Sequence, residues 1–341
     1  MPERIVLSVA CDTDPDFNPP FRTADSASVD DSLWGGISEG IRILRKHLMS
    51  SSLSNDFRSL PITWLLRSDR QIHEMYGDPA YCLTKFERIW DSERALNSEL
   101  GWHPHLYRWN DEVGEWLPFL GACDDLQILS ECLAALRQHC EITAVRTGWD
   151  YHSNDLMNMF AASGLKVDAS ALPGCSQIGL WFYDWRSTGR DPYYPSKTDY
   201  RIPGNEDEES LSIFEMPVLV RTLSHSLHQI RWVVRNLRGV WYKFDLRFLD
   251  WKSARWQGLM ITGPRSAFRS AVEQTFQVFS GAPDIFLNTY FHTNELLIPE
   301  FLERLILNLG TIDRLSRERG IEVVPTTLTR SASMAQDVCF R

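Results

Sequence analysis

Two pairs of polar residues, far apart in the sequence, have the types and spacing of metal ligands. Asp12 and Asp14 follow the apolar run 5–10, and His103 and His105 stand two positions apart much later in the chain. Residues two apart in an extended segment point the same way, so both imidazoles can reach one ion. Adding one carboxylate gives a two-histidine, one-carboxylate set, which leaves positions open for water and substrate.

Each pair alone also has an ordinary explanation. Asp-x-Asp is common in turns, where the carboxylates bind nearby backbone amides, and His-Pro-His is often a surface loop. Asp-x-Asp also occurs as a metal and nucleotide-sugar signature of glycosyltransferases. That function needs a nucleotide-binding βαβ unit ahead of the motif, and only eleven residues precede Asp12. The two pairs together therefore favour a shared metal site.

Arg146 and His292 are further polar residues at the ends of predicted elements. Arg146 follows the apolar segment 142–145, and His292 follows the segment 285–291. In parallel α/β folds the carboxyl ends of the strands converge on the active site. We therefore expect these residues near the aspartate and histidine pairs.

Hydrophobic periodicity predicts the elements that must position these side chains. Apolar, β-branched runs predict strands, and apolar residues at helical spacing predict helices; their alternation from the start of the chain is typical of a parallel α/β sheet or barrel. An aperiodic segment at 185–209 is expected to be an insertion over the barrel mouth. The predicted strands are 5–10, 61–66, 142–145, 165–167 and 285–291, and the predicted helices are 37–48, 81–100, 126–136, 155–162, 264–279 and 298–314.

Length and composition predict one globular domain. The 341 residues show no internal repeat and no clear linker, so we expect a single domain over 1–341, with an ordered core at about 4–325 and a frayed Ser/Thr-rich tail at 326–341. The net charge of −10 argues against nucleic-acid partners. Seven scattered cysteines, no signal peptide and no long apolar segment predict a cytoplasmic protein with reduced thiols and no membrane association.

The motifs, taken in order, resemble the polysaccharide deacetylase family, which has the chitooligosaccharide deacetylase homology fold and includes carbohydrate esterase family four. The resemblance covers roughly residues 4 to 295. It implies a distorted (β/α) barrel of about seven parallel strands with loop insertions. It rests on Asp12-Thr13-Asp14, on Glu99 to His105, on Arg146 to Trp149, on residues 164–170, on Asp184-Trp185, on 215–217 and on Phe291-His292.

The resemblance implies a role for each matching residue in the metal half of the site. Asp12 falls on the general base of the first motif and Asp14 on its metal ligand, while His103 matches the first metal-binding histidine. The commoner second motif has its second histidine four residues after the first, where this chain has Tyr107. We transfer that role to His105, as in relatives with a His-x-His form, which leaves open whether His105 or Tyr107 faces the ion.

The remaining residues of the implied site orient the general base and supply the general acid. Arg146 matches the arginine that orients the base, and His292 matches the general acid. Asp184 matches an acid of the cleft wall, and could hold the His292 imidazole in orientation. Four aromatic residues beside the motifs are expected to contact the substrate: Trp102, Trp149, Trp185 and Tyr107.

These roles predict a hydrolase that removes an N-acyl group, in the first instance acetyl, from a carbohydrate or a sugar-containing small molecule. One divalent ion, expected to be zinc, would lower the pKa of its water toward about 7. Two alternatives remain: a non-catalytic relative that binds a carbohydrate or a protein partner, and a hydrolase of a non-sugar amide. His225 and His228 have one-turn spacing but no acid nearby, so we expect no second metal site there. The sequence does not give the oligomeric state.

Overall fold

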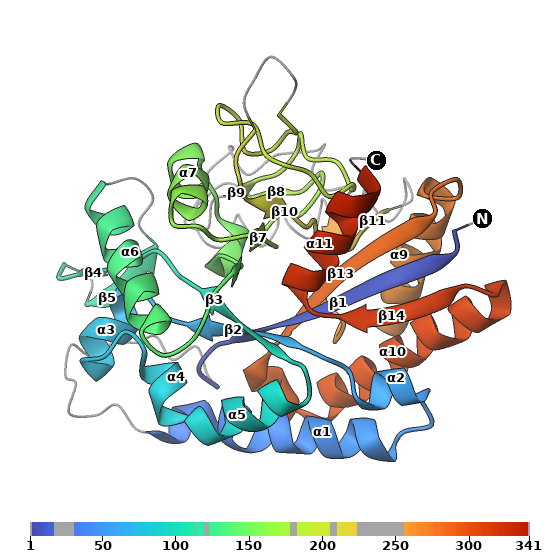
Figure 1. Cartoon of the computed structure of the whole chain (residues 1–341). Helices are drawn as coiled ribbons and strands as arrows, with labels where there is room; N and C mark the ends of the chain where they lie inside the picture. Colours follow the sequence, from blue (N-terminus) through green and yellow to red (C-terminus); the bar gives the residue numbers. More distant parts are fainter. Residues whose placement is uncertain are drawn as a thin grey trace.

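A curved parallel sheet forms the centre of the molecule (Figure 1). The computed structural model describes residues 2–16, 31–112, 114–118, 123–177, 183–204, 210–223 and 256–339. The strand order is β10-β7-β6-β3-β2-β1-β13, and β14 pairs with the first half of β1, all in parallel. The sheet confirms the expected distorted (β/α) barrel. The strands are β1 (Arg4–Thr13), β2 (Thr63–Arg67), β3 (Glu99–His103), β6 (Ala144–Val145), β7 (Val167–Asp168), β10 (Phe214–Glu215), β13 (Asp284–His292) and β14 (Glu322–Thr326).

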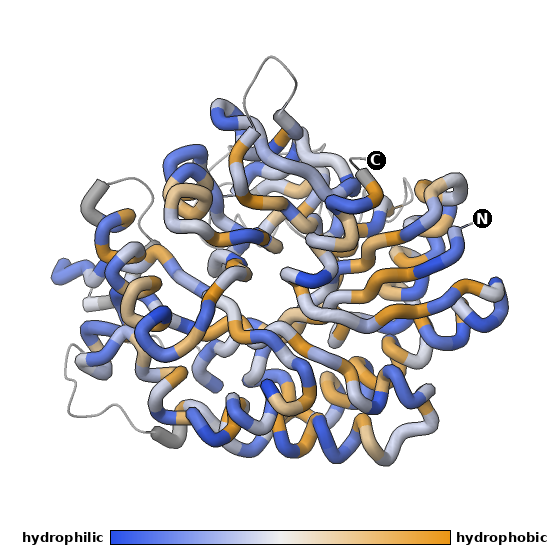
Figure 2. Tube along the Cα trace, viewed as in Figure 1, coloured by the Kyte–Doolittle hydropathy of each residue, from blue (hydrophilic) through white to orange (hydrophobic). Residues whose placement is uncertain are grey.

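Helices cover the outer side of this sheet, and Figure 1 shows α1, α5 and α10 along its lower edge. Large apolar side chains such as Trp64, Trp90 and Phe291 fill the layer between sheet and helices. In Figure 2 the central strands are mainly hydrophobic, whereas the helices alternate between the two colours, as expected of amphipathic helices. The helices are α1 (Ile41–Ser50), α2 (Asn55–Arg58), α3 (Arg70–Tyr76), α4 (Tyr81–Lys85), α5 (Glu87–Ala95), α6 (Cys123–Arg137), α7 (Asn154–Ala162), α9 (Arg265–Val278), α10 (Pro299–Arg319) and α11 (Leu328–Cys339).

The last helix, α11, packs against the other face of the sheet. Leu328, Ala332 and Ala335 are buried there against small and medium side chains of the strands, including Ala10 and Leu65. The expectation of a frayed tail at 326–341 is therefore wrong for the described residues up to 339. The segment is rich in Ser and Thr, but Leu328, Ala332 and Ala335 are spaced by four and three residues, which places them on one face of a helix.

The single helix predicted over 81–100 is also wrong, because the segment holds α4, α5 and the strand β3. Helix α5 ends before Asn97, which has φ 61°, a left-handed conformation that asparagine tolerates. Strand β3 then pairs with β2, with Arg67 opposite His103. This strand carries His103 to the carboxyl end of the sheet.

Short antiparallel strand pairs and turns complete the described chain. The pairs are β4 (Tyr107–Asn110) with β5 (Glu115–Pro118), β8 (Ser176–Gln177) with β9 (Tyr183–Asp184), and β11 (Val220–Thr222) with β12 (Trp256–Gly258). The described part of the predicted insertion, 185–204, joins the sheet edge through an antiparallel bridge between Tyr193 and Glu215 of β10. None of the described helices has the length and apolar character that a membrane crossing needs.

Candidate metal centre

The carboxyl ends of neighbouring strands bring the predicted residues to one place. Strand β1 extends to Thr13, so Asp12 lies within it, and Asp12 pairs with His292 of β13 on one side and with Leu65 of β2 on the other. Asp14 directly follows β1, and His103 ends β3. Parallel pairing places these strand ends along the same edge of the sheet.

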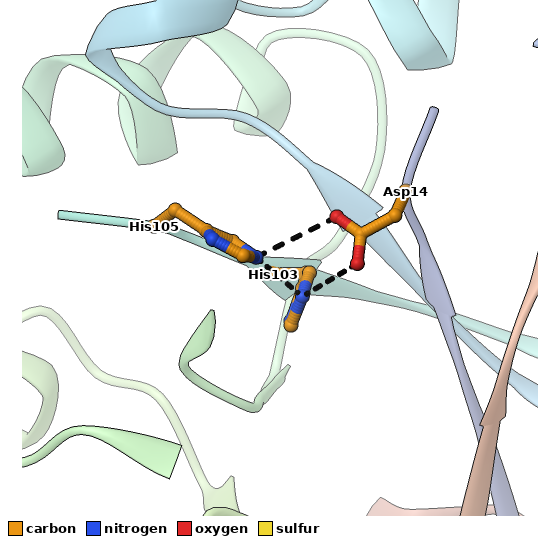
Figure 3. Close-up of side chains that lie close together, drawn as sticks. All are labelled: Asp14, His103 and His105. Atoms are coloured by element: carbon orange, nitrogen blue, oxygen red, sulfur yellow. Dashed lines mark hydrogen bonds and ion pairs between the residues drawn. The ribbon is translucent and has the colours of Figure 1, made fainter. Parts of the chain in front are cut away.

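Asp14, His103 and His105 form a cluster whose candidate ligand atoms all lie within 4.8 Å of one another (Figure 3). The Nε2 atoms of the two histidines are 3.0 Å apart. Oδ2 of Asp14 lies 3.9 Å from Nε2 of His103, and Oδ1 of Asp14 lies 3.5 Å from Nε2 of His105. Side chains from two distant segments therefore converge as the residue types predict.

Hydrogen bonding and the surrounding charges determine which atoms of this cluster can bind a cation. Nδ1 of His103 donates to the carbonyl oxygen of Arg146 over 2.7 Å, so in the neutral ring Nε2 carries the lone pair that faces the cluster. Burial, with the Arg67 cation, lowers the pKa of His105 well below its ordinary value, so the His105 ring is neutral at neutral pH. Burial raises the pKa of Asp14, but the positive charges around it, those of the histidines when protonated and that of Arg67, outweigh burial and lower the pKa well below the usual range.

The donor set fits a divalent metal ion. Two imidazole nitrogens and one carboxylate are the ligands that zinc and related ions take. Oδ1 of Asp12 is buried and has no hydrogen-bond partner among the described residues. An unpaired buried carboxylate oxygen is costly in a finished interior, so its presence beside the cluster is consistent with an ion and its water in the site.

His105, not Tyr107, contributes to the cluster. The Tyr107 ring stacks on the His105 ring with centroids 5.2 Å apart, and the Tyr107 hydroxyl accepts a 2.6 Å hydrogen bond from the indole N–H of Trp149. Gly148 packs against the same imidazole so closely that a Cβ there would lie 2.2 Å from the ring. Tyr107 and Gly148 therefore fix the plane of His105.

A second group, Asp12 with Arg146 and His292, lies beside the cluster. Oδ2 of Asp12 is 3.6 Å from Nη1 of Arg146 and 3.7 Å from Nε2 of His292. Arg146 is buried, forms an ion pair with Asp150, and lies over the Tyr290 ring at 3.5 Å. The guanidinium is thus held where it can neutralise and orient the Asp12 carboxylate.

His292 is the titratable group that could deliver a proton here. Burial alone lowers its pKa, but the Glu295 carboxylate and the charges of Asp12 and Asp14 outweigh this and raise the pKa to about 9. Glu295 also accepts a 3.0 Å hydrogen bond from the backbone N–H of His292, with its Oε2 3.8 Å from Nδ1. The imidazole is therefore protonated at neutral pH in this environment.

Both groups open into one cavity of about 320 Å³. Trp149 lines the cavity and is 39 % exposed. The backbone at Trp149 and Asp150 is left-handed, with φ of 59° and 55°, a strained conformation for two successive residues other than glycine. The cavity is lined by Asp12, Asp14, His103, His105, Arg146, Trp149, Asp150, Tyr290, His292 and Asn294.

Four predicted residues, Trp102, Trp185, Asp184 and Tyr107, are not among those that line this cavity. Tyr107 was expected to contact the substrate but instead stacks on His105. Trp102 and Trp185 are fully buried, and their indole N–H groups donate to the carbonyl oxygens of Ser68 and Asp150, so neither ring can stack on a sugar. Asp184 forms ion pairs with Arg186 and Arg201, and no contact joins it to His292 in the part of the chain that the structure describes. Glu295 occupies the position beside His292 that was predicted for Asp184. The prediction for Trp102 and Trp185 rested on their proximity to motifs, and that for Asp184 on the resemblance to the family; burial of the rings and the ion pairs of Asp184 contradict these roles.

The residues missed from the sequence are Arg67, Asp150, Tyr290, Asn294 and Glu295. Asp150 and Glu295 stand four and three positions after Arg146 and His292, a spacing that could have signalled a partner. Arg67 carries no such local signal. His225 and His228 lie outside the described residues.

Comparison with known proteins identifies the fold. No family model and no curated protein matches the sequence. A solved structure assigned as a polysaccharide deacetylase from Mycobacterium smegmatis matches with 13 % identity and a TM-score of 0.54, covering 99 % of this chain and 91 % of that one. The PuuE allantoinase (12 %, TM-score 0.51, 99 % and 92 % covered) and a protein assigned as a polysaccharide deacetylase from Pseudomonas aeruginosa PAO1 (11 %, 0.51, 98 % and 92 %) are similar as well. The chain has a polysaccharide deacetylase-like fold.

Proposed function

We propose that this protein is a metal-dependent hydrolase that removes an N-acyl group, in the first instance acetyl, from a carbohydrate or a sugar-containing small molecule. The observation that carries the proposal is the meeting of Asp14, His103 and His105 beside Asp12 and His292 in one cavity. The fold shared with deacetylases and an allantoinase supports hydrolysis of a carbon–nitrogen bond outside peptides.

The residues of the site supply the groups that amide hydrolysis needs. When bound, the divalent ion, which we propose is zinc, supplies a water of lowered pKa and polarises the acyl carbonyl. Asp12, held by Arg146, accepts the proton of the attacking water. His292, whose pKa is raised to about 9, donates a proton to the leaving amine nitrogen. Trp149, at the cavity edge, is placed to contact a sugar face.

The test is to measure metal content and acetate release on the same preparations. Wild-type protein should contain one equivalent of zinc, or bind it on titration, and should release acetate from members of a panel of N-acetylated sugars. Asp14→Ala and His103→Ala should lose both metal and turnover. His47→Ala, which changes an exposed histidine on α1, is the control and should keep both. Full metal and full turnover in either site variant would overturn the assignment.

The same site could instead act on a non-sugar amide, and the similarity in fold to an allantoinase favours including cyclic ureides in the panel. Ring opening would then be observed without acetate release. A wild-type protein that binds zinc and carbohydrate but turns over no member of the panel would indicate the non-catalytic alternative. We propose a small-molecule substrate and a cytoplasmic location, the latter because the cysteines at 11, 82, 132, 140 and 175 are free thiols.

A further inference from the structure

A buried arginine contacts Asp14 from the strand that lies between Asp14 and His103. Arg67 ends β2, and its side chain is 3 % exposed. Its Nη1 donates to Oδ1 of Asp14 over 2.7 Å, and its Nη2 donates to Oε1 of Gln71 over 2.8 Å. Its Nε forms a short ion pair with Oδ2 of Asp69. All three guanidinium nitrogens are thus engaged, which holds the group in one orientation.

Asp69 extends this contact to the backbone of His105. Its Oδ2 also accepts the backbone N–H of His105 over 3.1 Å, and its Oδ1 accepts the backbone N–H of Ile72 over 3.1 Å at the start of α3. Asp69 is completely buried. A continuous path therefore runs from the Asp14 carboxylate through Arg67 and Asp69 to the backbone of His105.

We propose that Arg67 and Asp69 are a positioning pair that holds Asp14 and His105 in the geometry required by the ion. This inference rests on the proposed function, because it takes the cluster to be a metal site. Both oxygens of Asp14 face the histidines, Oδ1 at 3.5 Å from Nε2 of His105 and Oδ2 at 3.9 Å from Nε2 of His103. Arg67 donates to Oδ1 alone, so this contact engages Oδ1 and favours ligation of the ion by Asp14 through Oδ2.

The charges explain why two residues are needed. A lone guanidinium beside the ion would oppose a second cation, but Asp69 neutralises Arg67 at a hydrogen-bond contact. Removing Arg67 alone would leave the buried Asp69 and the partly buried Asp14 without their cation, which destabilises a fold strongly. A useful test must therefore preserve the charge balance.

Two variants meet this condition. Arg67→Lys keeps the positive charge but lacks the planar fork that bridges Asp14 and Asp69. The double variant Arg67→Met with Asp69→Asn removes both charges at once. Arg70→Met is the matched control, because this neighbouring arginine pairs with Glu74 and Asp125 and does not contact the cluster.

The measurements are the zinc Kd by chelator competition, the visible absorption of the cobalt-substituted protein, and the free energy of unfolding in urea. We expect zinc binding about 10- to 100-fold weaker in both test variants, as for other groups that orient metal ligands. The cobalt spectrum should lose intensity, because a released Asp14 can ligate through both oxygens and raise the coordination number. Arg70→Met should match the wild type in Kd and spectrum.

The outcomes separate this inference from the proposed function. Wild-type protein that binds no zinc overturns both. The positioning role alone is overturned if the wild-type protein binds zinc and the folded test variants bind it with equal or tighter affinity and unchanged spectra. Tighter binding in the variants would show that the guanidinium competes with the ion for Asp14.

Discussion

Gly148 is the position where one added methyl group should remove a metal ligand without changing any charged residue. A Cβ built there lies 2.2 Å from Cδ2 and 2.3 Å from Nε2 of His105. Gly148 is not among the glycines of positive φ, so its backbone accepts alanine. Gly148→Ala therefore tests the position of His105 by steric contact alone.

The magnitude follows from these distances. Ordinary van der Waals contact begins at 3.4 Å, so the imidazole must move from 2.2 Å to at least that distance, a displacement of about 1.2 Å. Zinc–nitrogen bonds of about 2.0–2.1 Å tolerate only about 0.2 Å. Loss of a direct ligand should exceed the effect of losing a group that merely orients one. We therefore expect the zinc Kd to rise at least about 100-fold, or about 2.7 kcal/mol.

The assay combines chelator competition for zinc with urea unfolding. Overpacking should lower the free energy of unfolding by about 1–3 kcal/mol. Gly189→Ala, where a Cβ would meet no atom within 4 Å, is the control and should leave both quantities near the wild type. In a His105→Ala background the added methyl group has room, so its cost in unfolding free energy should largely vanish. Wild-type zinc affinity in Gly148→Ala, or an equal cost in both backgrounds, would refute the proposed contact.

Three further variants test the proposed catalytic groups. Asp12→Asn should keep its zinc but lose about 100-fold or more in kcat, the contribution typical of a general base; undiminished turnover would contradict that role. The value of kcat/KM should fall as the pH rises through the pKa of His292, about 9. Glu295→Gln removes a charge that raises this pKa, so it should move the alkaline limb of the profile to lower pH. An unmoved limb would exclude His292 as the acid. Trp149→Ala should raise KM for a sugar substrate with zinc content unchanged, and an unaltered KM would argue against stacking.

Much of the fold could be predicted from hydrophobic periodicity. The outer helices and the long strands β1 and β13 coincide with apolar segments of the sequence. An outer helix such as α10 buries one apolar face along its length, and the two strands bury residues on both faces. Strand β3 was missed because apolar residues at helical spacing continue up to its start, and only the left-handed turn at Asn97 separates them from it. Helix α11 was missed because alanines at 332 and 335 form an apolar face that composition does not reveal.

The cluster of Asp14, His103 and His105 could be predicted because the types and spacing of these residues are those of metal ligands. Its supporting residues could not, because their roles arise from pairing between strands. Arg67 lies beside Asp14 only because β1, β2 and β3 are neighbours, and nothing local in the sequence connects the two. Asp184 was assigned to His292 on motif order, yet the arginines at 186 and 201 satisfy it locally.

Strand register determines the geometry of the whole centre. The pairs Asp12–His292 and Arg67–His103 are directly opposite one another in parallel strands, so each strand presents its polar residue at the same level. The hydroxyl of Thr13 accepts the backbone N–H of Arg67 over 2.8 Å and continues the register of β1 and β2 beyond their last ladder bonds. A slip of one residue would turn Asp12 to the opposite face of the sheet, since side chains alternate along a strand. That slip would also exchange the buried apolar faces of β1. The packing that fixes the register of β1 in the fold therefore also fixes the position of Asp12 in the site.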